Sequence, residues 1–177
     1  MMIRKFLGTA LLVSLTWSPV GIGEDNQAPT QQPPKAKPYG DWALQCPQDT
    51  SCSLRQRVFL DGDEKRPLLS IILQYVNKPT RLLIAIRTPL NTVLISGLEL
   101  SVDKGTADTY PFHHCRSEGC LTIFPVKKGL RKSLRLGNRA NVGYVLTDGK
   151  KYNVPVSLKG ITAGLKALKK AAASTKK

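Results

Sequence analysis

The chain has 177 residues, of which 41% are hydrophobic and 22% charged, and its formal net charge is +15. This length suffices for one domain with a hydrophobic core and excludes two domains of ordinary size. Residues 116–177 hold 15 of the 27 Lys and Arg residues, but only Glu118 and Asp148 are acidic there. Such a charge either attracts a polyanion, such as nucleic acid, lipopolysaccharide, a sulfated glycan or an acidic membrane, or simply keeps an exported protein soluble.

The N-terminus is predicted to be a secretory signal peptide, residues 1–23. Arg4 and Lys5 precede the apolar residues 6–17, a run too short to span a bilayer of ~30 Å. Gly21 and Gly23 supply the small residues of a cleavage site before Glu24. We therefore expect an exported protein without a transmembrane span that resides in the periplasm, with outer-membrane association or secretion left open.

Composition also predicts the domain boundaries. Residues 24–38 are rich in Gln, Pro and Ala without hydrophobic periodicity, so they cannot bury enough apolar surface to offset the entropy of ordering. We expect a disordered tether there and a frayed basic tail at residues 169–177. One domain is predicted between them, at residues 39–168.

Most of this domain shows the period of β-strands. Leu98, Leu100 and Val102 alternate with polar residues, as in a half-buried strand. A hairpin is predicted around Asp148-Gly149, because the apolar residues alternate on both sides of a turn that favours positive φ. Pro155 lacks a backbone donor, so its strand should lie at an edge.

Two mainly apolar runs, residues 68–73 with Ser70 inside the run and residues 82–86, fit central strands that are covered on both faces or the core of a sandwich. In all, eight to ten short strands are separated by turn residues. The predicted fold is mainly β, an antiparallel β-sandwich with one short basic helix and a short C-terminal helix.

The two helices follow from apolar spacing. Val126, Leu130 and Leu134 fall on one side of a helix at residues 127–136, and Gly137 should end it. The other side collects the cations Lys127, Lys128, Arg131, Lys132 and Arg135. A last helix should carry Ile161, Leu165 and Leu168 as its apolar stripe, with Ser157 as a candidate N-cap.

The four cysteines are interpreted as two disulfides in an oxidising compartment, for which three pairings exist. We favour Cys46 with Cys52 and Cys115 with Cys120, because each pair flanks polar turn residues. Loops this short contribute only about 2 kcal/mol each in the chain-entropy model.

Residues 110–120 contain both histidines and should form a strand, a tight turn and a second strand. His113, His114, Cys115 and Cys120 offer an alternative zinc ligand set. However, no C-x₂-C spacing is present, and adjacent histidines on a strand point to opposite faces. A hydrolase would use His113 or His114 as its base near Ser117 and Glu118, yet the sequence contains no nucleophile elbow, metalloprotease, P-loop or dinucleotide motif. We therefore predict neither enzyme activity, metal nor cofactor.

Two modes of binding remain. In one, aromatic residues contact an envelope or host-surface protein, although such residues are more often core anchors; these are Tyr39, Trp42, Tyr110 and Phe112. In the other, the basic helix binds an anionic polymer or lipid surface as a peripheral contact, aided by Arg139, Lys150 and Lys151. Nucleic acid is not expected, because an exported chain would not meet it and no aromatics interleave the basic run.

Several short motifs, in this order and spacing, resemble the invasion-associated locus B family. They are Tyr39-Gly40-Asp41-Trp42 before Cys46 and Cys52, Pro89-Leu90, Val102-Asp103, Pro111-Phe112 before Cys115, Gly119-Cys120, and Val156-Ser157-Leu158-Lys159-Gly160. Where family members often have Gly after Pro-Leu, this chain has Asn91, which also tolerates positive φ.

The resemblance covers essentially the whole domain. It implies a small β-rich protein that Gram-negative bacteria, chiefly alphaproteobacteria, export to the periplasm or beyond. The family is named for a role in the invasion of host cells such as erythrocytes, and the resemblance implies no catalytic mechanism. A general role in the cell envelope is equally compatible with it.

Overall fold

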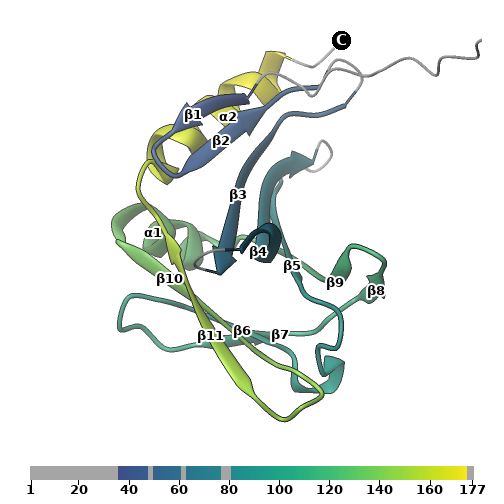
Figure 1. Ribbon diagram of the computed structural model, residues 1–177. Helices are drawn as coiled ribbons and strands as arrows, with labels where there is room; N and C mark the ends of the chain where they lie inside the picture. Colours follow the sequence, from purple (N-terminus) through teal and green to yellow (C-terminus); the bar gives the residue numbers. More distant parts are fainter. Residues whose placement is uncertain (1–35, 48–49, 61–62, 77–80, 175–177) are drawn as a thin grey trace, which may run out of the picture. The chain divides into compact units, whose positions relative to one another are not determined.

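The structure of the protein is a computed structural model that describes residues 36–47, 50–60, 63–76 and 81–174 (Figure 1). All described elements belong to the compact unit formed by residues 33–177. The predicted signal peptide and nearly all of the predicted tether lie outside the described residues. The elements, in chain order, are β1 (Ala36–Tyr39), β2 (Trp42–Gln45), β3 (Ser53–Leu60), β4 (Asp63–Val76), β5 (Arg81–Thr88), the 3₁₀ helix η1 (Leu94–Ser96), β6 (Leu98–Val102), β7 (Asp108–Tyr110), β8 (His114–Arg116), β9 (Gly119–Pro125), α1 (Lys128–Leu136), β10 (Arg139–Val145), β11 (Lys151–Ser157) and α2 (Ile161–Ser174).

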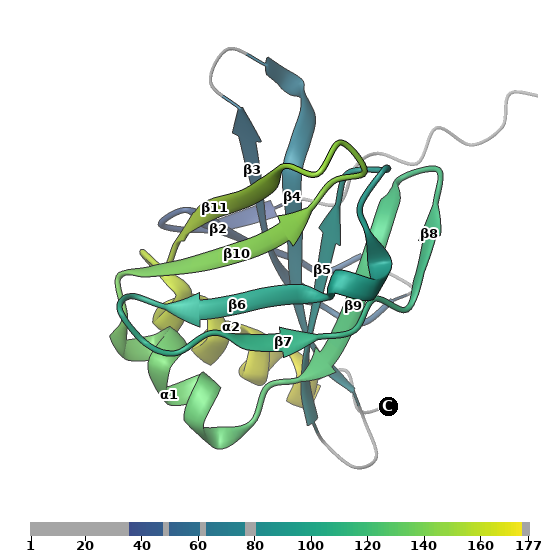
Figure 2. The ribbon, with the colours of Figure 1, turned by 90° about the horizontal axis from the view of Figure 1, so that it is seen from below.

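The strands form two antiparallel sheets. The large sheet has the order β1-β2-β3-β4-β5-β9-β8, and the small sheet has the order β11-β10-β6-β7. In Figure 2 the small sheet lies across β3, β4 and β5 of the large one, with α1 and α2 beside it. The mainly-β antiparallel sandwich with two helices is therefore confirmed.

One hydrophobic core joins the two sheets and both helices. Leu54, Leu73, Ile84 and Phe124 are register partners across β3, β4, β5 and β9, and all four are buried. The small sheet contributes buried residues such as Val142 to the same core. We call the side of the large sheet that carries these buried residues its inner face.

The predicted hairpin and its turn are present. β10 pairs with β11 through seven residues on each strand, and Gly149 at the turn has φ 80°. Pro155 lies on β11, an edge strand of the small sheet, where its missing N–H leaves no ladder position empty. Asn91 has φ 68°, so it adopts the positive φ that was predicted to be tolerated there.

Two motifs from opposite ends of the domain lie against each other. The N–H of Asp41 donates to the carbonyl of Lys159 at 3.1 Å, and Trp42 Nε1 donates to the carbonyl of Ser157 at 3.0 Å. The Ser157 hydroxyl also donates to the Asp41 carboxylate. We call residues 39–42 and 157–160 together the clasp.

The clasp corrects the predicted helix cap. Ser157 is the last residue of β11, and α2 begins only at Ile161, so Ser157 does not cap the helix. Its hydroxyl is instead engaged by Asp41 and by the N–H of Lys159.

Two predicted boundaries also differ in the structure. β1 begins at Ala36, inside the stretch expected to be the tether, because residues 36–39 pair with β2. α2 continues through Ser174, beyond the expected start of the tail at Lys169, because Ala171 and Ala172 extend its apolar stripe against the core.

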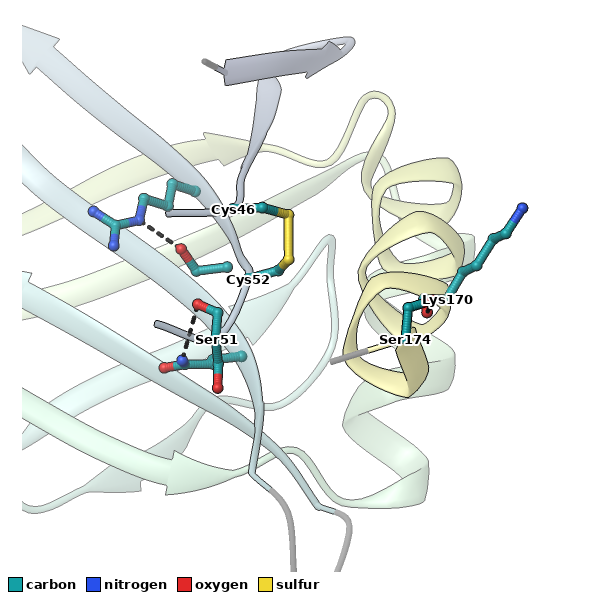
Figure 3. Close-up of a disulfide and its surroundings, with 8 residues drawn as sticks. Cys46, Ser51, Cys52, Lys170 and Ser174 are labelled. Atoms are coloured by element: carbon teal, nitrogen blue, oxygen red, sulfur yellow. Dashed lines mark hydrogen bonds between the residues drawn. A yellow bond between two sulfur atoms is a disulfide. The ribbon is translucent and has the colours of Figure 1, made fainter. Parts of the chain in front are cut away.

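Both short-range disulfides are formed, Cys46 with Cys52 and Cys115 with Cys120. The first lies beside α2, as Figure 3 shows, and the second joins β8 directly to β9. The chain between Tyr110 and His114 passes from the small sheet to the large one. Residues 110–120 are therefore not one hairpin, because only the part from His114 onward forms it.

Candidate functional site

The predicted basic helix is α1. Leu134 is buried and Leu130 half-buried against the core, and Val126 just before the helix is buried as well. Gly137 ends α1, and its N–H donates to the carbonyl of Ser133 at 2.8 Å. The apolar side of α1 thus fixes the helix to the sandwich and leaves its basic side facing solvent.

The exposed side of α1 is a stripe of cations with no compensating acid. Its members are Lys127 at the N-cap and Lys128, Arg131, Lys132 and Arg135 in the helix, and we call these five residues the α1 stripe. No acidic residue lies in the first turn, where the helix dipole favours negative charge. None of the five makes an ion pair with a carboxylate in the described residues.

This arrangement costs helix stability. Lys127 and Arg131, Lys128 and Lys132, and Arg131 and Arg135 are spaced i,i+4, and each like-charge pair destabilises a helix by about 0.2–0.5 kcal/mol. Two lysines at the N-terminus add an unfavourable interaction with the dipole. Residues that destabilise their own secondary structure are expected mainly at functional sites.

A shallow hollow of about 320 Å³ lies on this surface. Four members of the α1 stripe line it together with Leu136, whose side chain is 74% exposed. Arg131 Nε is buried there without a hydrogen-bond partner among the described residues. The hollow therefore combines cationic groups with one apolar side chain in contact with water.

The structure divides the eight residues predicted to bind an anionic surface. Arg139 opens β10 immediately after α1 and is exposed, so it extends the α1 stripe. Lys150 and Lys151 lie at the other end of the β10–β11 hairpin (Figure 2). Lys150 Nζ lies 3.5 Å from Asp148 Oδ2, and Lys151 Nζ lies 2.7 Å from Glu99 Oε1, so each of the two lysines has an acidic partner.

Three cations of α2 were not predicted as part of a site. Lys166, Lys169 and Lys170 are exposed on this helix, which contacts α1. The Thr162 hydroxyl of α2 donates to the carbonyl of Arg135 at 3.0 Å, which fixes the two helices together. The apolar spacing that continues from Leu168 to Ala171 and Ala172 was the signal that could have placed Lys169 and Lys170 on a helix.

The histidine segment is not arranged as a zinc site. Cys115 and Cys120 are consumed by their disulfide, which leaves only the two histidines of the predicted ligand set. In the described residues no group of three metal-binding side chains comes together. The N–H of Ile123 donates to His113 Nδ1 at 3.4 Å, while His114 is exposed on β8.

Nor does the same segment assemble a hydrolytic site. The Ser117 hydroxyl donates to Glu118 Oε1 at 2.8 Å, and in the described residues it makes no hydrogen bond with a histidine. This hydroxyl is the main reason why the pKa of Glu118 is lowered, with Arg87 and Arg116 contributing less. A carboxylate that accepts from Ser117 in open solvent does not supply the imidazole base that a nucleophilic serine needs.

The aromatic residues considered for protein binding are mainly core residues. Trp42 is 2% exposed, and its indole N–H donates to the carbonyl of Ser157 within the clasp. Tyr110 stacks on Phe124 with ring centroids 3.5 Å apart. Tyr39 and Phe112 are half-buried against the core. These side chains stabilise the domain and do not form an exposed aromatic patch.

Comparison with known proteins places the chain. No curated protein sequence matches it. The crystal structure of invasion associated protein b from Bartonella henselae is similar, with a TM-score of 0.68 and 18% sequence identity over 77% of this chain and 96% of that one. None of the described helices is long and apolar enough to cross a bilayer. The sequence profile of the Invasion associated locus B (IalB) protein matches residues 42–169, and the chain therefore belongs to this family.

Proposed function

We propose that this protein is an exported protein of the cell envelope that binds an anionic surface through the α1 stripe. The observation that carries this proposal is a set of five cations on one exposed helix face without an acidic partner in the described residues, kept at a cost to helix stability. Export is supported by the two disulfides, which persist in oxidising compartments, and by the family.

The binding mechanism is electrostatic attraction followed by local contact. Each Lys or Arg close to an anionic membrane contributes about 1 kcal/mol, so the α1 stripe is sufficient for reversible peripheral binding. Arg139 extends the cationic surface, and Leu136 supplies an apolar contact beside it. Such a surface would hold the protein on phosphate-bearing lipids of the envelope or of a host cell, in keeping with the name of the family.

Sedimentation with vesicles tests the proposal. We expect the protein to bind vesicles of phosphatidylcholine containing about one-third phosphatidylglycerol, and to be released as salt rises from about 50 to 200 mM. The variant Lys128→Gln/Arg131→Gln/Lys132→Gln/Arg135→Gln should bind roughly tenfold or more weakly, because it removes four attractive contacts.

The matched control is Lys150→Gln/Lys151→Gln, which removes cations that already have acidic partners. It should change binding by less than about twofold. Equal binding to pure phosphatidylcholine, or full binding by the α1 variant, would show that the α1 stripe is not the binding surface.

A further inference from the structure

The central strands of the large sheet are apolar on both faces. On β4, buried Leu69, Ile71 and Leu73 alternate with half-buried residues that include Ile72. The opposite side of the sheet carries the half-buried residues Ile72, Leu83, Ala85, Leu121 and Ile123. An antiparallel sheet with one solvated face normally alternates apolar and polar residues instead. Apart from Ser70 and Gln74 on β4, the centre of this second face is therefore apolar enough to be covered as well.

Only the inner face has that cover in the described residues. The small sheet and the two helices share one core with the inner-face residues of β3, β4, β5 and β9. Gly164 of α2 packs directly against Leu54, which belongs to the inner face. We call the opposite side of β3, β4, β5, β9 and β8 the outer face. The small sheet and both helices belong to the core on the inner side, and residues 89–91 and 117–119 line a hollow with Ser70 and Arg87 at one margin of the outer face.

The described outward positions along the centre of the outer face carry arginines but neither Asp nor Glu. The strand register places Arg55 beside Ile72, Ala85 and Ile123 in one cross-strand row, and Arg57 beside Ser70, Arg87 and Leu121 in the next. Arg81 and Arg116 occupy outward positions at the margins. From Ser53 to Val58, from Leu68 to Val76 and along β5, β8 and β9, no outward strand position holds Asp or Glu.

These arginines have no carboxylate partner of their own. None of the five makes an ion pair with a carboxylate in the described part of the chain. Burial, and then the neighbouring charge of Arg57, lowers the pKa of Arg55. Glu118 lies near Arg87 and Arg116, but it sits in the exposed β8–β9 turn and accepts a hydrogen bond from Ser117. The face thus combines an apolar centre with positive charge, of which Glu118 at one margin compensates only the part near Arg87 and Arg116.

We propose that the outer face binds a partner protein whose surface presents an apolar patch flanked by Asp and Glu side chains. Arginine planes suit bidentate pairing with carboxylates, and apolar centres with Arg are typical of protein interfaces. A second copy does not fit, because a two-fold contact through this face would set arginine rows against each other. Nucleic acid would require aromatic platforms, and the outward positions of β4, β5 and β9 hold none.

An NMR titration of the ¹⁵N-labelled, oxidised protein tests this surface. The probe is a capped peptide of about twelve residues in which Leu and Glu alternate, and the comparison peptides replace Glu with Lys or with Gln. We expect the Leu-Glu peptide to shift the amide signals of Ile72, Ala85 and Ile123, since it offers apolar and acidic side chains together. The affinity of the two comparison peptides should be lower by at least about tenfold.

Two variants of equal charge separate this surface from the α1 stripe. The affinity is measured from the amide signals of Ile72, Ala85 and Ile123, so that peptide bound at the α1 stripe is not counted. By these signals Arg55→Gln/Arg57→Gln/Arg87→Gln should weaken binding of the Leu-Glu peptide roughly tenfold, whereas Arg131→Gln/Lys132→Gln/Arg135→Gln should change it less than about twofold. Thermal unfolding of both variants checks that they fold.

Four results would overturn the proposal. These are no shift on the outer face, equal binding of the Lys or Gln peptide, concentration-dependent shifts of the face without peptide, and shifts of the face by phosphatidylglycerol vesicles. The third would indicate self-association and the fourth a membrane-binding face. Because the α1 stripe is tested by a separate variant, its failure or success does not decide this one.

Discussion

Tyr144 is a buried side chain with an unsatisfied polar group. It is 1% exposed, its ring stacks on Tyr152 with centroids 5.5 Å apart, and its hydroxyl has no hydrogen-bond partner among the described residues. Burial first, and then the neighbouring Tyr152, raise the pKa of Tyr144 to about 12. The neutral phenol is therefore favoured in the folded protein.

The variant Tyr144→Phe should stabilise the protein by about 1 kcal/mol at neutral pH, because it removes a buried hydroxyl that has lost its hydration. It should also reduce sensitivity to alkali. The pKa of about 12 in the folded state exceeds the ordinary value of 10.0, so the unfolded chain loses this proton more readily than the folded protein. Ionisation of Tyr144 therefore does not lower stability below about pH 10 and lowers it progressively as pH rises toward 12.

Urea unfolding at pH 7, 9 and 11 measures both effects. The decrease in unfolding free energy between pH 9 and 11 should be smaller in Tyr144→Phe than in the parent. Burial and Asp108 also raise the pKa of Tyr110, so stability should still fall at high pH in Tyr144→Phe. The test is therefore the difference in this fall between the variant and the parent. A destabilised Tyr144→Phe protein would mean that the hydroxyl has a partner after all.

Some residue-scale features were predictable from sequence and others were not. Asn91 and Gly149 were assigned to turns because few residues tolerate positive φ, and both have it. Ser157 was assigned to a helix cap because serine commonly has that role. Its actual partner, Asp41, is 116 residues away, and local sequence carries no information about a contact at that distance.

At the scale of elements, α1 was predictable because its pattern is strongly periodic. Its apolar positions, its cations and its end at Gly137 were all predicted within one residue. The division of strands between two sheets was not predictable, since alternation defines the two faces of a strand but not its neighbours. For the same reason the apolar runs were compatible either with strands covered on both faces or with a sandwich core, and the structure has the sandwich, whose described cover lies on the inner face.

The electrostatic cost of the α1 stripe leads to a stability prediction. The quadruple Gln variant of α1 should be more stable than the parent by about 0.5–1 kcal/mol, because it removes the i,i+4 repulsions of the helix. Urea unfolding of the variant and the parent at low salt measures this difference in unfolding free energy, and added salt should reduce the difference. Lower stability of this variant would argue that the cations support the fold and were not retained for binding.

At the scale of the whole molecule, the clasp fixes both ends of the domain together. Gly160 has φ 87°, and a Cβ at this position would lie 2.0 Å from the carbonyl oxygen of Tyr39. Gly40 faces the same contact from the other side, because a Cβ there would lie 2.5 Å from the carbonyl oxygen of Lys159. Backbone meets backbone here, and neither strand can move aside without losing its hydrogen bonds.

Gly160→Ala should therefore destabilise the domain by about 2–4 kcal/mol, through strain at positive φ and the backbone clash. Gly129→Ala is the matched control. A Cβ at Gly129 meets nothing within 4 Å, so this variant should gain about 0.5–1 kcal/mol from helix propensity. Urea unfolding compares the two variants. Equal unfolding free energies would show that the clasp does not contribute to the stability of the domain.

The clasp joins Trp42 to Ser157, which lie 115 residues apart in the sequence. A polypeptide that leaves a ribosome or crosses a membrane with its N-terminus first delivers Gly40 long before Gly160. Residues 39–42 then have no clasp partner until residues 157–160 have been synthesised. Closure of the clasp is therefore a late event in the formation of the tertiary structure.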